Sequence, residues 1–313
     1  MLNVSVIIPN YNYGRFLAAA LESVLTQTYA AYEVIVVDDG STDDSLAVLA
    51  GYADHVSVLR QKNQGVGAAR NAGVAAASGD LIAFLDADDY WLPRKLEVQV
   101  AHFAAQPHLG LVHCGVHYVD VAGHFQREDL NGRAGWVAED LLQFRPAVVA
   151  PGSTSLIPRR VFQELGGFRS EQELPAAEDW EFSLRLACHY EIGFAREVLV
   201  HYRQHGISRH RNIVAMEEAM LTAFRFAFQD YVTTEEFRQT CYARLYMVLA
   251  GSYFRAGQLV RFGRAALLSL WHNPAEIHYL LQFFERQWQR LSKAPPATVA
   301  GNTCNSHEGK RAN

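Results

Sequence analysis

Cysteine is scarce in this chain of 313 residues, with four in all: Cys114, Cys188, Cys241 and Cys304. No two of them form a C-x-x-C pair, so the sequence indicates neither a zinc site nor a framework of disulfides. A long basic run is also lacking, and the formal net charge is −5. Both facts argue against a nucleic-acid-binding surface.

Long uncharged apolar runs are missing as well. No such stretch reaches the ~18–20 residues that a membrane-spanning helix needs. The chain opens with "MLNVSVIIPN", which has neither a charged start nor a small-residue cleavage site, so we expect no signal peptide. A cytoplasmic protein is therefore the default expectation. The phosphate-binding signatures G-x-x-x-x-G-K-[S/T] and G-x-G-x-x-G are absent too.

What the sequence does have is a regular alternation of two patterns. Short runs rich in β-branched and aliphatic residues predict buried strands at 4–9, 32–37, 56–61 and 81–85. Helical patterns separate them, including a helix of small residues at 65–79 that can pack close to a sheet. Ser41 or Thr42 is expected to cap the helix after the second strand. Strands that alternate with helices predict an α/β fold with a mostly parallel central sheet.

Acidic clusters directly follow two of these strands. Asp38 and Asp39 come after the second strand, and "DADD" at 86–89 comes after the fourth. The carboxyl ends of parallel strands form the edge at which open α/β sheets bind ligands. Either cluster alone is also compatible with a simple helix-capping turn. Two clusters at the same edge favour a binding site.

The chemistry of the second cluster suggests what it binds. The Asp-x-Asp pattern of Asp86 and Asp88 offers oxygen ligands, which Mg²⁺ and Mn²⁺ prefer. Mg²⁺ commonly uses one or two carboxylates and completes its shell with water and phosphates. Phosphates held by a metal, without a glycine-rich cradle, suit a nucleoside diphosphate that acts as a leaving group.

Several longer stretches carry a resemblance to a known family. "VSVIIPNYNYGRFL", "VIVVDDGSTDDS", "NQGVGAARNAGVAAASGDLIAFLDADDYWLP" and "AAEDWEFSLRLA" resemble family 2 glycosyltransferases of the GT-A fold, in the family's order. The resemblance extends through "HYRQHGIS", which ends at residue 208. It implies a nucleotide-sugar-binding domain and a reaction that inverts the anomeric centre.

The resemblance also implies roles for single residues. Pro9 and Tyr11 would flank the nucleotide base, and Asp39 would accept a hydrogen bond from it, typically from uracil. Asp86 would lie near the ribose and the metal, and Asp88 would bind the metal. The implied cofactor is Mn²⁺ or Mg²⁺.

A catalytic base is implied further along the chain. Asp179, in Glu178-Asp179-Trp180, would take the proton of the attacking acceptor hydroxyl. The alternative is a structural acid in the first turn of an amphipathic helix, where acids are favoured. The resemblance favours the catalytic role, and a base distant in sequence from the metal motif is compatible with an in-line displacement.

Three other polar residues have two interpretations each. Arg203 and His205 resemble a loop of the family that closes over the diphosphate or touches the metal, but they are equally typical of a polar surface loop. Arg70 is a candidate for contact with the diphosphate; the alternative is an ion pair to the acidic edge.

The chain changes character after residue 210, where the predicted catalytic domain (1–210) ends. Residues 211–292 predict consecutive helices, with breaks near Thr233, Gly257 and Asn273. These helices could pack on the catalytic domain or rest on a membrane surface or partner. Residues 293–313 have the composition of a disordered tail.

Together these features predict a metal-dependent, inverting glycosyltransferase. The expected donor is a UDP-sugar, with GDP and dTDP as alternative nucleotides. The expected acceptor is a hydroxyl of a saccharide or lipid-linked sugar, in cell-surface polysaccharide synthesis at the inner face of the membrane. The alternative is a catalytically idle nucleotide-sugar-binding module. The presence of Asp39, Asp88 and Asp179 favours the enzyme.

Overall fold

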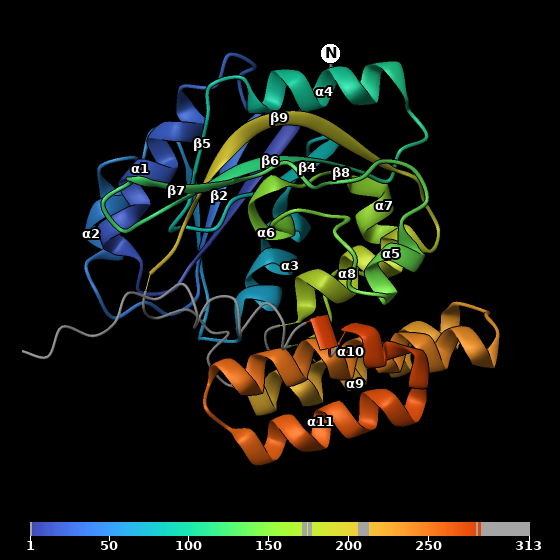
Figure 1. The fold of residues 1–313 in the computed structure, drawn as a ribbon. Helices are drawn as coiled ribbons and strands as arrows, with labels where there is room; N and C mark the ends of the chain where they lie inside the picture. Colours follow the sequence, from blue (N-terminus) through green and yellow to red (C-terminus); the bar gives the residue numbers. More distant parts are fainter. Residues whose placement is uncertain (1, 171–173, 175–176, 206–212, 280, 283–313) are drawn as a thin grey trace, which may run out of the picture.

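The structure is a computed structural model that describes residues 2–170, 174, 177–205, 213–279, 281 and 282. Its centre is a nine-stranded sheet with the order β3-β2-β1-β4-β8-β6-β9-β5, and β7 pairs with β6 (Figure 1). The strands are β1 (Val4–Asn10), β2 (Glu33–Asp38), β3 (Ser57–Arg60), β4 (Leu81–Phe84), β5 (Tyr90–Trp91), β6 (Leu111–Val119), β7 (Phe125–Asp129), β8 (Leu156–Pro158) and β9 (Ile192–Arg203).

Helices cover both faces of the sheet and continue beyond it. Those of the sheet domain are α1 (Gly14–Leu25), α2 (Ser45–Ala50), α3 (Val66–Ala76), α4 (Lys95–Ala105), α5 (Ala138–Leu142), α6 (Pro151–Thr154), α7 (Arg159–Glu164) and α8 (Glu178–Ala187). A helical region follows, with α9 (Ile213–Asp230), α10 (Glu235–Arg255), α11 (Leu259–His272) and the 3₁₀ turn η2 (Pro274–Glu276).

The first half of the sheet is parallel. β1 pairs in parallel with β2 and β4, and β2 with β3. Each of the four predicted runs overlaps one of these strands, which confirms the α/β class. The second half is mixed, because β8 runs antiparallel to both β4 and β6 while β9 runs parallel to β6. The parallel half is the part that the local alternation of strand and helix could predict.

The small-residue helix α3 packs as expected against β1 and β2. A Cβ atom on Gly73 would lie 2.4 Å from Ile7 Cγ2 and 3.2 Å from Val37 Cγ2. Any side chain at this position would therefore push the helix off the sheet. The close packing sets where α3 begins, and this in turn fixes the side chains that it contributes to the sheet edge.

The turn before α2 differs from the prediction that Ser41 or Thr42 caps the helix. The helix begins at Ser45, whose backbone N–H and hydroxyl both donate to Asp43 Oδ1, at 3.0 and 2.5 Å. The Ser41 hydroxyl accepts bonds from Asn10 Nδ2 and the Asn12 N–H instead, both at 3.1 Å. The capping prediction was wrong because β1 and the loop after it each supply a donor that only the folded chain brings next to Ser41.

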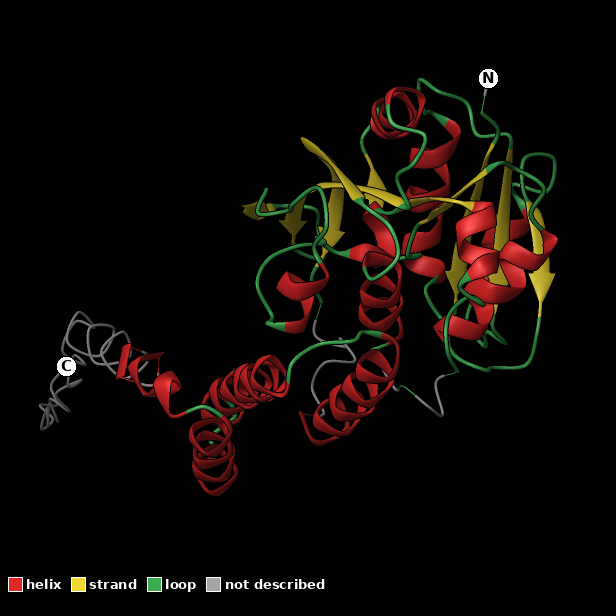
Figure 2. Cartoon of the chain, turned by 90° about the vertical axis from the view of Figure 1, so that its right-hand side faces the viewer, coloured by secondary structure: helices red, strands yellow, loops and turns green. Residues whose placement is uncertain are grey.

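The helical region has its breaks where the sequence predicts them. The Thr234 hydroxyl caps α10 by accepting a bond from the Phe237 N–H at 3.2 Å, and Gly257, with φ of +71°, separates α10 from α11. Figure 2 shows the helices extending away from the sheet domain. The predicted tail at 293–313 lies outside the described residues. Among the described residues, no helix is long and apolar enough to cross a membrane.

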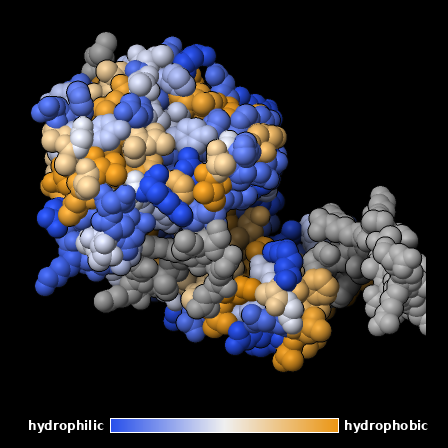
Figure 3. All heavy atoms as spheres, turned by 90° about the vertical axis from the view of Figure 1, so that its left-hand side faces the viewer, coloured by the Kyte–Doolittle hydropathy of each residue, from blue (hydrophilic) through white to orange (hydrophobic). Residues whose placement is uncertain are grey.

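The first helix of this region shares a core with the sheet domain. The Phe224 ring of α9 lies 5.8 Å from the rings of both Trp180 and Phe144. The outermost helix, α11, packs on α10, where the Ser269 hydroxyl donates to the Ala243 carbonyl at 2.8 Å. Figure 3 shows that hydrophobic and hydrophilic residues both reach the surface of this region. α9 is thus anchored to the sheet domain, while α11 is supported mainly by α10.

Candidate functional site

A cavity of about 690 Å³ opens at the carboxyl ends of β1, β2 and β4. This volume lies in the range of small-molecule sites, roughly 300–1,000 Å³. Every site residue predicted from the sequence lines it: Pro9, Tyr11, Asp39, Arg70, Asp86, Asp88, Asp179, Arg203 and His205. The fold therefore brings together side chains that lie up to 196 positions apart in the numbering, from Pro9 to His205.

Asp39 is held by uncharged donors. Its Oδ1 accepts from Gln61 Nε2 at 2.8 Å and from the Gln64 N–H at 2.9 Å, and its Oδ2 accepts from the Gly65 N–H at 2.9 Å. The residue is 3% exposed. A carboxylate oxygen can accept two hydrogen bonds, so Oδ2 keeps one acceptor position for a ligand. Asp39 thus shapes the loop before α3 and can still face the cavity.

Arg70 is a buried cation that lines the cavity. It is 2% exposed, its Nη2 lies 2.6 Å from Asp86 Oδ1, and its Nη1 lies 3.3 Å from Glu178 Oε1. Burial lowers the pKa of Arg70, but the charges of Asp86, Glu178 and Asp179 outweigh it and raise the pKa overall. Of the two interpretations of Arg70, the ion pair to the acidic edge is the one that the structure contains.

The three carboxylates after β4 meet three different partners. Asp86 pairs with Arg70, and Asp88 Oδ2 lies 2.7 Å from His205 Nε2. Asp89 accepts from the Ser153 hydroxyl at 2.5 Å and from the Arg203 N–H at 2.8 Å. Asp89 is 2% exposed and does not line the cavity, so its role is to tie this turn to α6 and the end of β9.

The cluster nevertheless carries excess negative charge. Burial and the neighbouring Asp86 raise the pKa of Asp88, although His205 opposes this shift. Burial, Asp88 and Asp86 hold the pKa of Asp89 well above its ordinary value. Both shifts arise because the charged forms are crowded together in a site shielded from water. A bound cation would relieve this repulsion.

A small residue is required beside the Arg70–Asp86 pair. A Cβ atom on Gly152 would lie 2.7 Å from both Arg70 Nη2 and Asp86 Oδ2. Gly152 belongs to α6, which follows Ala150 in the left-handed conformation at φ of +40°. The absence of a side chain here lets α6 close over the ion pair.

Asp179 and Glu178 open helix α8 at the cavity wall. Burial and the charge of Asp179 raise the pKa of Glu178 to about 7, although Arg70 opposes the shift. Asp179 is half-buried, and its Oδ1 accepts from the Trp180 N–H at 2.7 Å. Two adjacent acids at a helix start, one with a raised pKa, are typical of a site that handles a proton.

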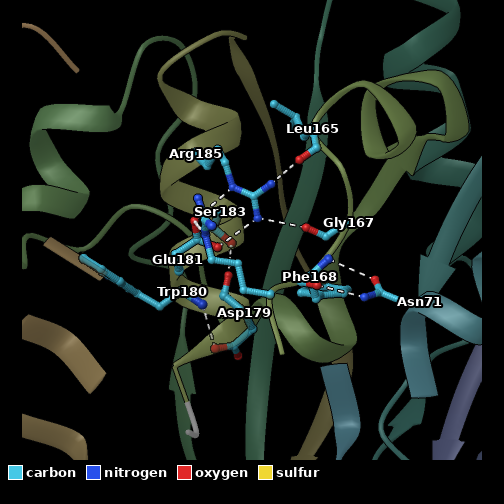
Figure 4. A network of polar contacts seen from close by, with 10 residues as sticks. Asn71, Leu165, Gly167, Phe168, Asp179, Trp180, Glu181, Ser183 and Arg185 are labelled. Carbon is cyan, nitrogen blue, oxygen red and sulfur yellow. Dashed lines mark hydrogen bonds and ion pairs between the residues drawn. The ribbon is translucent and has the colours of Figure 1, made fainter. Parts of the chain in front are cut away.

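A polar network fixes the position of α8 (Figure 4). Arg185 donates to the carbonyls of Leu165 and Gly167 and to Glu181 Oε2, the last two at 2.8 and 2.9 Å. Asn71 of α3 exchanges two hydrogen bonds with the Phe168 backbone, at 2.8 and 2.9 Å. Helix α8, the segment after α7 and helix α3 are thereby locked together, so Asp179 stands on a rigid support.

Other cavity residues were not predicted from the sequence. Tyr118 and Tyr202 are register partners on the parallel strands β6 and β9, with ring centroids 5.3 Å apart. The guanidinium of Arg127, on β7, lies 3.5 Å from the Tyr118 ring centroid. The rule that ligands meet the carboxyl ends of parallel strands could have identified both tyrosines. No sequence pattern pointed to Arg127.

The residues present fit a hard divalent cation only with help from a ligand. Within the described ranges, no group of three or more His, Cys, Asp or Glu side chains is arranged to hold a metal. Asp88 and His205 are the nearest donors to one another, and His205 Nδ1 is buried without a hydrogen-bond partner. A cation that takes few protein ligands and completes its shell with phosphates and water suits this donor set.

The fold and this acidic cavity define the class: the chain has the GT-A fold of nucleotide-sugar-dependent glycosyltransferases. The mannosyltransferase PcManGT from Pyrobaculum calidifontis, solved with GDP-Man and Mn²⁺, is similar with a TM-score of 0.60 at 18% identity, over 94% of this chain and 81% of that one. S. aureus TarS 1–349 with UDP-GlcNAc is similar with a TM-score of 0.55 at 17% identity, over 85% and 90%.

Sequence comparison identifies the family. Residues 5–166, more than half of the chain, match the family described as glycosyl transferase family 2, and the protein belongs to this family. An uncharacterized glycosyltransferase of Nostoc is 47% identical over 36% of each chain. One of Rickettsia prowazekii is 30% identical over 64% of each chain. The matches to these relatives thus span less than two thirds of their length.

Proposed function

We propose that this protein transfers a sugar from a nucleoside-diphosphate sugar, a UDP-sugar in the first place, to a hydroxyl of a saccharide or lipid-linked acceptor. The single observation behind this proposal is that Asp39, Asp88 and Asp179 line one cavity together with Arg70. A catalytically idle binding module would have no need of a base, and the full set of acids therefore favours the enzyme. The proposed setting is cell-surface polysaccharide synthesis.

In the proposed mechanism, Asp179 accepts the proton of the acceptor hydroxyl while the hydroxyl oxygen attacks the anomeric carbon. One displacement at this carbon inverts its configuration. Asp179 is well suited to this task because α8 is held by Arg185 and so cannot drift from the cavity wall. Arg70 pairs with both Glu178 and Asp86 and so holds these two acids close together.

The donor is proposed to bind along the other acids. Pro9 and Tyr11 would flank the base, and the remaining acceptor position on Asp39 Oδ2 would take a hydrogen bond from it. Arg203 is proposed to contact the diphosphate. Asp88, with His205 and the neighbouring Asp86, would hold Mn²⁺ or Mg²⁺, which when bound stabilises the negative charge on the leaving diphosphate.

The experiment that tests this proposal is a nucleotide-sugar screen with a metal control. UDP-, GDP- and dTDP-sugars are compared for thermal stabilisation and for slow hydrolysis. Calorimetry then measures UDP binding in Mn²⁺ and in chelator, for the wild type and for Asp88→Asn. We expect UDP to bind more tightly with Mn²⁺ and this gain to shrink in Asp88→Asn. Equal UDP affinity in metal and in chelator would contradict metal dependence.

A further inference from the structure

Helix α11 has large apolar side chains on two sides. On its inner side Phe262 and Leu268 pack against the core, and Ala265 is 2% exposed. On its outer side Val260 is 89%, Leu267 70% and Trp271 75% exposed. A helix at the surface of a protein normally has polar side chains on its outer side.

The exposed residues form one continuous stripe. Val260, Arg264, Leu267 and Trp271 follow one another at helical spacings of four, three and four, which places them on one face. We call these four residues the outer α11 face. Single exposed apolar residues are common on protein surfaces, but a stripe of this kind marks a contact surface. Figure 3 shows hydrophobic patches beside hydrophilic ones on the helical region.

The described residues from 255 onward differ in charge from the part of the chain before them. They contain three basic residues, Arg255, Arg261 and Arg264, and one acidic residue, Glu276, a net charge of +2. The preceding residues, 1–254, contain 20 against 30, a net charge of −10. Helix α11 itself has Arg261 and Arg264 and no acidic residue. An anionic surface would therefore attract this end of the molecule and repel the rest of it.

Helix α11 lies toward the end of the molecule at which the cavity opens. In Figures 1 and 2 the parallel strands run from the N-terminal end of the sheet domain toward the end at which α9, α10 and α11 lie. The cavity opens at the carboxyl ends of these strands. The cavity and helix α11 therefore lie toward the same end of the molecule.

We propose that the outer α11 face binds an anionic lipid surface. Trp271, Leu267 and Val260 would enter the boundary between headgroups and acyl chains, and Arg261, beside the face, would lie among the lipid phosphates. Arg264 pairs with Glu217 of α9, Nη1 to Oε1 at 3.0 Å, but its side chain remains 60% exposed and would add a second contact to the phosphates. Such a helix lies in the plane of the membrane, consistent with its being too short to span one. Lipid binding by this face is independent of the proposed transfer reaction. The further step, that membrane binding brings lipid-linked acceptors to the cavity, rests on the proposed function.

A second copy of the chain fits the face less well. In a symmetric dimer each side presents the same patch to the other. Arg261 and Arg264 of one copy would then approach the same residues of the other, which is unfavourable. An anionic lipid surface meets both the apolar and the basic residues of the face.

Co-sedimentation of the full chain with vesicles tests the proposal. Vesicles of phosphatidylglycerol and phosphatidylcholine in equal parts are compared with phosphatidylcholine alone. We expect binding to the anionic vesicles, weakened by salt, and a decrease of about 100-fold in the double variant Leu267→Ser, Trp271→Ser, since each buried large apolar side chain contributes about tenfold or more. The matched control is Trp136→Ser, because Trp136 is 65% exposed on the sheet domain. The control should bind as the wild type does.

A second variant separates charge from apolar contact. Arg261→Gln should weaken binding about fivefold, the usual effect of one basic residue at an anionic surface. Arg60→Gln, an exposed arginine of β3, should have no effect. Circular dichroism checks that each variant is folded, and UDP binding is measured separately, so failure of the proposed function would leave the vesicle result unchanged.

Two results would overturn the proposal. One is equal vesicle binding by the wild type and the double variant, or no binding by either. The other is a dimer in sedimentation velocity that the double variant dissociates, which would make the outer α11 face a self-association surface.

Discussion

The two acidic segments at the sheet edge are stabilised in opposite ways. Asp39 is surrounded by neutral donors, two backbone N–H groups and one side-chain amide. Asp86 and Asp88 instead meet Arg70 and His205. Neutral donors hold a loop in shape without balancing charge, whereas the arginine partner of Asp86 shows that charge itself is concentrated there.

This difference predicts different outcomes for the same chemical change. Replacing an aspartate by asparagine keeps its size and removes its charge. At Asp39 the change should affect mainly the fold of the loop, because hydrogen-bond geometry is what Asp39 supplies. Around Arg70 and Asp179 the change should affect charge balance and chemistry. The predictions below run from the largest expected effect to the smallest.

The largest effect is expected for Asp179→Asn. Transfer should fall by about 10²–10⁴-fold while donor binding remains, because the variant loses the proton acceptor but keeps its shape. Steady-state transfer and UDP calorimetry measure the two effects. The product should have the anomeric configuration opposite to that of the donor, as read by NMR coupling constants. Near-wild-type transfer would remove Asp179 from the mechanism, and a retained configuration would remove the single displacement.

The next largest effect is expected for Arg70→Met. The substitution leaves Asp86 and Glu178 without their buried counter-charge, which typically costs about 3–5 kcal/mol in the free energy of unfolding. Denaturant unfolding measures the loss. Arg94→Met is the matched control, because Arg94 pairs with Glu97 at 3.6 Å but its side chain is 58% exposed. The control should lose about 0–1 kcal/mol. Similar losses of unfolding free energy in both variants would contradict a stabilising role for the buried ion pairs of Arg70.

Glu178 should give the protein a pH-dependent stability. Its pKa rises from the ordinary 4.5 to about 7 in the folded chain, so the folded state binds the proton more tightly than the unfolded state. Its contribution is therefore most favourable below pH 4.5 and is lost as the pH rises toward 7, by a few kcal/mol at most. Comparing the pH dependence of unfolding for wild type and Glu178→Gln isolates this contribution. Parallel curves would show that Glu178 titrates normally.

The smallest effect is expected for Asp39→Asn. The new amide group would face at least one N–H that now donates to the carboxylate, at a cost of about 1–3 kcal/mol in unfolding free energy. Asp54→Asn, at an exposed position, is the control and should be neutral. UDP affinity should fall together with stability. Unchanged stability with lost UDP binding would instead make Asp39 purely a ligand contact.

Much of the site was predictable because its signals are local. A buried strand followed directly by aspartate can be recognised from a few consecutive residues. The parallel arrangement of β1, β2 and β4 then brings these aspartates to one edge of the sheet. The breaks of the helical region at Thr234 and Gly257 were predictable for the same reason, since capping and positive φ act over a single turn.

Other features depended on pairs that lie far apart in the sequence. The prediction that Ser41 or Thr42 caps α2 was wrong because a donor from β1 reached Ser41. The outward stripe on α11 was equally hidden, because a periodic pattern predicts an amphipathic helix but not which of its faces meets α10.

The sequence by itself thus determined which strands are directly followed by aspartates along the chain. This in turn predicted the edge of the sheet at which a ligand would bind. Only the tertiary structure decided that Arg70 pairs with Asp86 and Glu178, which lie 16 and 108 positions away, and that Asp89 supports the site rather than lining it. The physical reason is that charge balance in a buried site depends on distances between side chains. Packing sets these distances, and no local periodicity records them.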